Sequence, residues 1–134
     1  MRLFLDANIL FTAAHNQSGK AAFVIELGAA RHFQLFTSAY AREEATRNLL
    51  SKYPASVPHL EKLLEQITIT PVNPSAPFPA TLAEKDAAIF QAAVTCRATH
   101  LLTGDIKHFG PFMNRPEKSY SIIIQSVAEF LASL

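Results

Sequence analysis

The sequence is short of the features that mark several specialised classes of protein. It has one cysteine, Cys96, in 134 residues. A single cysteine cannot form an intramolecular disulfide, and disulfide-stapled domains are typical of oxidising compartments. We therefore expect a protein of the reducing cytoplasm.

The chain also lacks an excess of charge of one sign. Twelve lysine and arginine residues stand against eleven aspartate and glutamate residues, which gives a formal net charge of +1. No overall field would drive such a protein onto nucleic acid or an anionic membrane. This balance argues against a simple coat for DNA or RNA, but it leaves open an enzyme that meets nucleic acid through a metal ion.

Long apolar runs are missing as well. Charged residues such as Glu26 and Arg31 interrupt every apolar stretch before it reaches the roughly 20 residues that cross a bilayer. The apolar run 3–5 before Asp6 is too short for the core of a signal peptide. We therefore expect no membrane association. Neither G-x-x-x-x-G-K-[ST] nor G-x-G-x-x-G occurs, so we expect no nucleotide cofactor.

What the chain does have is apolar content, 49% of its residues, in blocks that alternate between two patterns. We expect one domain over residues 1–134, with strands at 3–5, 33–37, 67–72, 100–103 and 120–124. Helices are expected at 19–30, 39–50, 58–66, 84–98 and 127–131. Strands that alternate with helices predict an α/β fold with a parallel sheet covered on both faces.

Three local signals mark the ends of these elements. Thr81 with Glu84, and Ser126 with Glu129, have the spacing of a capping box at a helix start. Four prolines in residues 71–79 predict a surface loop, because proline interrupts both helix and strand.

Two acidic residues follow expected strands directly. Asp6 comes after the first strand and Asp105 after the fourth. Open parallel sheets bind ligands at the carboxyl ends of their strands, so these carboxylates become neighbours if the two strands are adjacent. Each residue alone is explained as well by a turn or a helix cap.

Further acidic residues lie on helices that begin at the same edge of the sheet. Asp86 is in the first turns of the fourth expected helix, where complementing the helix dipole would also explain it. Glu43 and Glu44 are on the second. We favour Glu44, because Ala41 and Leu49 lie closer to it at helical spacing and indicate the semi-buried side.

Four carboxylates at one edge need a cation. Two of them about 4 Å apart repel by roughly 4 kcal/mol at an effective dielectric constant of 20. Oxygen ligands favour hard ions, so Mg²⁺ or Mn²⁺ is expected rather than Zn²⁺. An acidic cluster that holds such an ion beside a phosphodiester is suited to metal-assisted hydrolysis.

Four segments in this order, 5–10, 37–49, 86–93 and 102–109, resemble the motifs of the PIN domain family of nucleases, especially the VapC-like toxin ribonucleases. Ser38 precedes Glu44 by six positions, as in the family, which supports Glu44 over Glu43. The resemblance implies a three-layer α/β/α fold with strand order 3-2-1-4-5. It implies a divalent-metal-dependent endoribonuclease that cuts RNA.

The same resemblance assigns roles to residues and suggests partners. It places the metal-binding and catalytic carboxylates at Asp6, Glu44, Asp86 and Asp105, with Asn8 and Thr103 as polar supports that orient the acids. Many relatives are toxins silenced by an antitoxin, and many are homodimers. A cognate antitoxin and a homodimer are therefore partners that the family suggests, although neither is written in this sequence.

Other readings stay open. The same fold could serve as a catalytically silent module that binds RNA or protein, although such a module has no reason to keep four repelling carboxylates. An aspartyl-phosphate enzyme fits less well, because Asn8 stands where a phosphatase of that type has its second aspartate. We expect His108 to be an exposed loop residue and Lys85 to belong to a solvated first turn.

Overall fold

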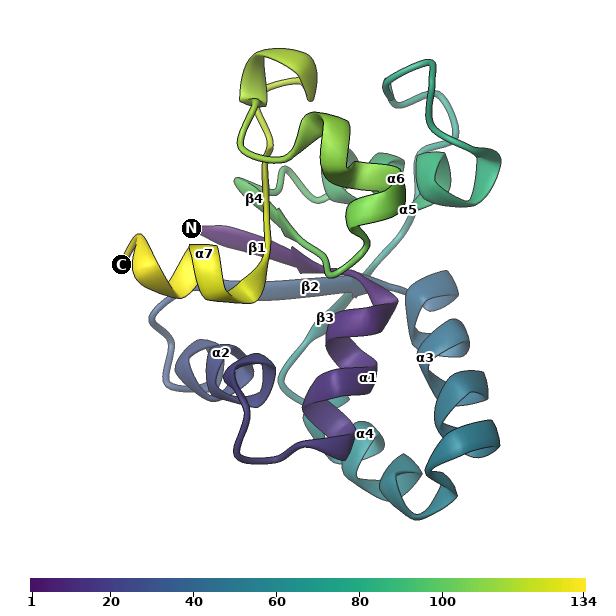
Figure 1. Ribbon diagram of the computed structural model, residues 1–134, viewed down its shortest axis with the longest axis vertical. Coiled ribbons are helices and arrows are strands. Elements are labelled where there is room, and N and C mark those ends of the chain that lie inside the picture. Colours follow the sequence, from purple (N-terminus) through teal and green to yellow (C-terminus); the bar gives the residue numbers. More distant parts are fainter.

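A five-stranded sheet forms the centre of the molecule in the computed structural model, which covers residues 1–134 (Figure 1). Its order is β3-β2-β1-β4-β5, and every neighbouring pair is parallel. The strands are β1 (Arg2–Leu5), β2 (Gln34–Ser38), β3 (Thr68–Thr70), β4 (His100–Leu102) and β5 (Ile123–Gln125). The strand order implied by the sequence resemblance is confirmed.

Helices cover the sheet on both sides (Figure 1). Helices α1 to α4 lie on one face and α5 and α6 on the other, because the chain reverses its direction across the sheet between β3 and β4. The helices are α1 (Ala7–His15), α2 (Lys20–Ala29), α3 (Ala39–Lys52), α4 (Val57–Leu64), α5 (Glu84–Thr95), α6 (Ile106–Phe109) and α7 (Val127–Ala132). This is the expected three-layer α/β/α arrangement. No helix is long and apolar enough to traverse a bilayer.

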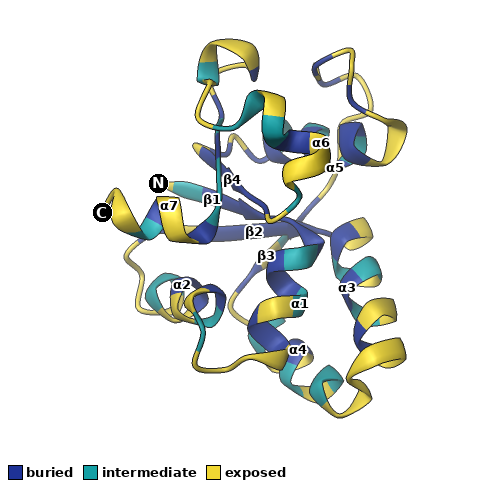
Figure 2. Cartoon of the chain, viewed as in Figure 1, coloured by how far each residue is buried: buried dark blue, intermediate teal, exposed yellow.

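The core follows from the position of β1 in the middle of the sheet. Leu3, Phe4 and Leu5 are all fully buried, because a central parallel strand is covered from both faces. Figure 2 shows buried residues along the strands and exposed residues on the outer faces of the helices. One cluster of 34 buried apolar residues links the elements, and it includes Cys96.

Some local expectations were wrong. Helix α1 was not predicted, because it begins one residue after β1 and its apolar residues continue the apolar run of the strand. The N-cap of α5 is Ala83 without a side-chain cap, so the Thr81 capping box does not form, whereas the Ser126–Glu129 box does. Strand β5 begins later than expected, because Tyr120 and Ser121 have positive φ angles of 52° and 67°.

Gly28 gives a test of how α2 packs on the sheet. A Cβ atom at this position would lie 2.5 Å from Cγ of Leu35 in β2 and would also collide with its Cδ1 atom. We expect Gly28→Ala to lower the free energy of unfolding by roughly 1–3 kcal/mol, although alanine is the better helix former. Urea denaturation measures the change. Gly110→Ala is the control, since its Cβ would meet nothing closer than 3.5 Å; equal stability of the two variants would contradict this packing.

Candidate active site

Asp6 is fixed at the carboxyl end of β1 by four hydrogen bonds. Its backbone N–H donates to the carbonyl of Leu102 at 3.1 Å, which ties it to the end of β4. The side chain caps α1, with Oδ1 accepting from the N–H of Ala7 at 2.7 Å. Oδ2 accepts from the Thr103 hydroxyl at 2.8 Å and from Nδ2 of Asn8 at 3.3 Å. Both carboxylate oxygens are therefore held in place.

Asn8 and Thr103 extend this network to the segment after β4. The Thr103 hydroxyl, which is fully buried, also accepts from the N–H of Asp105 at 3.0 Å. Oδ1 of Asn8 accepts from the N–H of Gly104 at 2.7 Å. The two residues thus join the ends of β1 and β4 through hydrogen bonds.

Asp105 and Asp86 both lie close to the ring of His108. Asp105 caps α6, with Oδ1 accepting from the N–H of His108 at 3.1 Å. Nδ1 of His108 donates to Oδ2 of Asp105 at 2.7 Å and lies 3.7 Å from Oδ2 of Asp86. One ligand atom from each of the three lies within 4.8 Å of the others, a spacing that suits a metal ion.

Glu44 and Glu43 differ in their surroundings as the sequence suggested. Ser38 caps α3 and accepts from the N–H of Ala41 at 3.1 Å, so the helix starts at the carboxyl edge of the sheet. Glu44 is partly buried and forms an ion pair with Lys85 at 2.5 Å, whereas Glu43 is exposed.

The pKa values of Asp6, Asp86 and Asp105 do not shift in one direction. Burial raises the pKa of Asp6, to which the charges of Glu44 and Asp105 add, against the hydrogen bonds that it accepts. Burial also raises the pKa of Asp86, and Asp105 and Glu44 add to the shift. Burial acts in the same direction on Asp105, but the hydrogen bonds and charge of His108 outweigh it and lower its pKa. Asp105 thus repels Asp6 and Asp86, yet its own pKa is lowered because His108 stabilises its charge.

Two residues that sequence reasoning set aside belong to the cluster. His108 is exposed as expected, but it lies in α6 rather than in a loop, and it contacts both Asp105 and Asp86. Its position three residues after Asp105 was the available signal. Lys85 is bound to Glu44, which raises the pKa of the lysine through their hydrogen bond. No local pattern shows this pair, because its partners come from α3 and α5.

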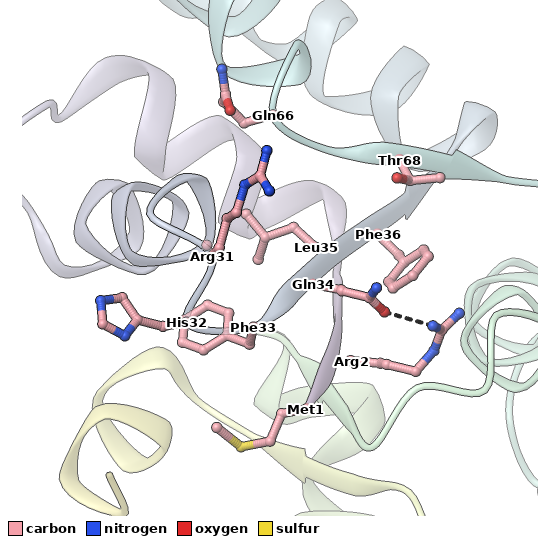
Figure 3. A pocket seen from close by; sticks show the side chains of 11 residues that line it. Met1, Arg2, Arg31, His32, Phe33, Gln34, Leu35, Phe36, Gln66 and Thr68 are labelled. Carbon is pink, nitrogen blue, oxygen red and sulfur yellow. Dashed lines mark hydrogen bonds between the residues drawn. The ribbon is translucent and has the colours of Figure 1, made fainter.

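The largest cavity, about 830 Å³, lies at the opposite edge of the sheet (Figure 3). Its polar side chains do not converge: Arg31 points towards Gln66 and His32 points away from the other groups. Arg2 is already engaged, since it donates to Oε1 of Gln34 at 2.6 Å and to the carbonyl of Cys96 at 2.8 Å. The acidic cluster therefore remains the candidate site.

The donor set of the cluster fits a hard divalent cation. Asp6 and Asp86 are buried carboxylates whose charges are unfavourable without a cation, and Asp86 accepts no hydrogen bond from the chain. Carboxylate oxygens are the ligands that Mg²⁺ and Mn²⁺ prefer.

The fold and this site define an α/β protein with acids at the carboxyl edge of a parallel sheet. Asp86 and Asp105 lie with His108 at metal-binding spacing. Asp6 and Glu44 lie outside that group but near enough for their charges to act on it or to be acted on by it. Residues 2–107 match the family model of the PIN domain, a range that includes all four acids. The chain belongs to the PIN domain family.

Solved structures agree on the fold. The structure of VapBC2 from Rickettsia felis bound to a DNA fragment from its promoter aligns with a TM-score of 0.69 and 17% identity, over 94% of this chain and 98% of that chain. VapBC-1 from nontypeable Haemophilus influenzae aligns with a TM-score of 0.60 and 17% identity, over 96% and 99%. A search of curated proteins finds no significant match.

Proposed function

We propose that this chain is a Mg²⁺- or Mn²⁺-dependent endoribonuclease and the toxin of a type II toxin–antitoxin pair. The observation that carries the proposal is the cluster of Asp6, Glu44, Asp86 and Asp105 at the edge where parallel sheets bind ligands. Membership of the PIN domain family supports nuclease chemistry.

In this proposal the metal ion and the protein side chains make different contributions to the reaction. A divalent ion bound by the four carboxylates would activate water and neutralise charge that develops on the phosphodiester. The chain orients these ligands: Thr103 and Asn8 hold Asp6, and His108 holds Asp105 through Nδ1–H. Such fixed partners keep carboxylates in place for catalysis.

An antitoxin partner is supported by the two structural neighbours, which are both VapBC proteins. Pairing with a cognate antitoxin in the cytoplasm, and formation of a homodimer, belong to the same proposal.

Cleavage of an RNA panel by the purified protein tests the proposal. We expect cleavage with Mg²⁺ or Mn²⁺, no cleavage in EDTA, and loss of more than about 100-fold in Asp6→Asn and Glu44→Gln, a larger loss than outer partners cause. Glu43→Gln is the matched control, since it removes an equal charge one residue away and is expected to cut as the wild type does. RNA binding without metal-dependent cleavage would favour the silent module instead.

A further inference from the structure

A small cavity leads away from the acidic cluster between α1 and α3. These helices pack side by side on one face of the sheet (Figure 1). The cavity has a volume of about 200 Å³ and one apolar residue among the five that line it: Asn8, Phe11, Glu44, Asn48 and Lys52. Asn8 and Glu44 belong to the acidic cluster, so the cavity starts where the scissile bond would lie.

Three aromatic rings gather at the far end of the two helices. The rings of His15, at the end of α1, and Tyr53, which caps the end of α3, are stacked with centroids 4.3 Å apart and an interplanar angle of 3°. Phe11 lies 5.5 Å from His15 and 5.9 Å from Tyr53, at a tilt. Tyr53 is 45% exposed and His15 is exposed, so the ring pair lies at the surface rather than in the core.

A cation stands between this ring pair and the acidic cluster. Nζ of Lys52 lies 5.8 Å from the ring centroid of Phe11, and the lysine takes part in no salt bridge. Asn48, one helical turn before Lys52, adds an amide that both donates and accepts hydrogen bonds. Exposed rings, a cation outside any salt bridge and amides are the groups that bind single-stranded nucleic acid through stacking and phosphate contacts.

We propose that this α1–α3 groove holds the single-stranded RNA that flanks the bond to be cut, with a base stacked on the His15–Tyr53 pair and a phosphate at Lys52. The proposal rests on the ribonuclease function argued above. From Asn8 to His15, α1 rises about 10 Å, which matches about three stacked nucleotides at about 3.4 Å each. A protein partner suits the groove less well, because only Phe11 in the cavity is apolar.

Binding of a fluorescein-labelled short single-stranded oligoribonucleotide of mixed sequence, followed by anisotropy in Ca²⁺, tests the groove. Tyr53→Ala is expected to weaken binding about tenfold and Tyr53→Phe to bind as the wild type does, because stacking needs the ring and not the hydroxyl. Lys52→Ala is expected to weaken binding and to reduce the salt slope by about 1. Tyr120→Ala and Lys118→Ala remove exposed residues of the same types away from the groove and should change neither quantity.

Kinetics with Mn²⁺ separate binding from chemistry. Tyr53→Ala and Lys52→Ala should raise KM and leave kcat unchanged, because neither side chain contacts the acids. Wild-type affinity in both variants, confirmed as folded by circular dichroism, would overturn the groove, and so would a wild-type chain with no affinity for the probe. If the two variants bound RNA as the wild type does but no longer bound the cognate antitoxin, the groove would be a protein interface. Binding that depends on Tyr53 in a chain that never cleaves RNA would keep the groove and overturn the ribonuclease.

Discussion

Asp86→Asn is expected to abolish ribonuclease activity and, in the same protein, to raise the free energy of unfolding without metal. Asp86 is 4% exposed, and Nδ1 of His108 lies 3.7 Å from its Oδ2 atom, too far for a hydrogen bond. Its raised pKa means that the folded state disfavours the charge that the side chain carries at pH 7. Asparagine keeps the shape and removes the charge, so we expect a gain of about 1 kcal/mol, or roughly 4 °C in Tm.

The size of this effect depends on pH in a defined way. The cost of the Asp86 charge is present above its folded-state pKa and vanishes as pH falls below the unfolded value of 3.8. Urea denaturation in EDTA at pH 7 and near pH 4 should therefore show a stability gain that shrinks at the lower pH. A variant less stable than the wild type at pH 7 would contradict the unfavourable charge.

Asp105→Asn is the matched comparison. The same change of chemical group should again abolish activity but lower the stability, because the pKa of Asp105 is lowered and its carboxylate accepts two hydrogen bonds from His108. Stability from Asp105 is present above its unfolded pKa and is lost as pH falls through the folded value. If both variants lost activity while their free energies of unfolding changed in opposite directions, the loss of activity could not be explained by a change in stability.

Divalent metal is expected to give the second large effect, a rise in the Tm of the wild-type chain. An ion that binds only the folded state stabilises it by about 2.7 kcal/mol at 100 times its Kd, which is roughly 10 °C for a chain of this length. Differential scanning fluorimetry with Mg²⁺ or Mn²⁺ measures the shift, and EDTA should reverse it.

Two controls separate a site from general screening of charge. NaCl at matched ionic strength should give a much smaller shift, and Asp86→Asn should lose most of the metal effect because one ligand is missing. A shift of equal size in Asp86→Asn and in the wild type would rule out Asp86 as a ligand.

Local patterns in the sequence determined much of this protein. Alternating strands and helices predict the α/β class, and the four acidic motifs in order predict the family and the strand order. Asp6 and Asp105 could be placed at the carboxyl edge, because a residue directly after a strand has its position set by its immediate neighbours. Ser38 and Glu44 follow the same logic along α3.

The tertiary structure decided what depends on contacts between distant segments. Helix α1 is nine residues long and is capped by Asp6, and its apolar pattern alone could not be told from the end of a strand. The pairing of Lys85 with Glu44 and the approach of His108 to Asp86 join different elements. Opposite pKa shifts in Asp86 and Asp105 arise because burial and hydrogen-bond partners, rather than residue type, set the free energy of a charge.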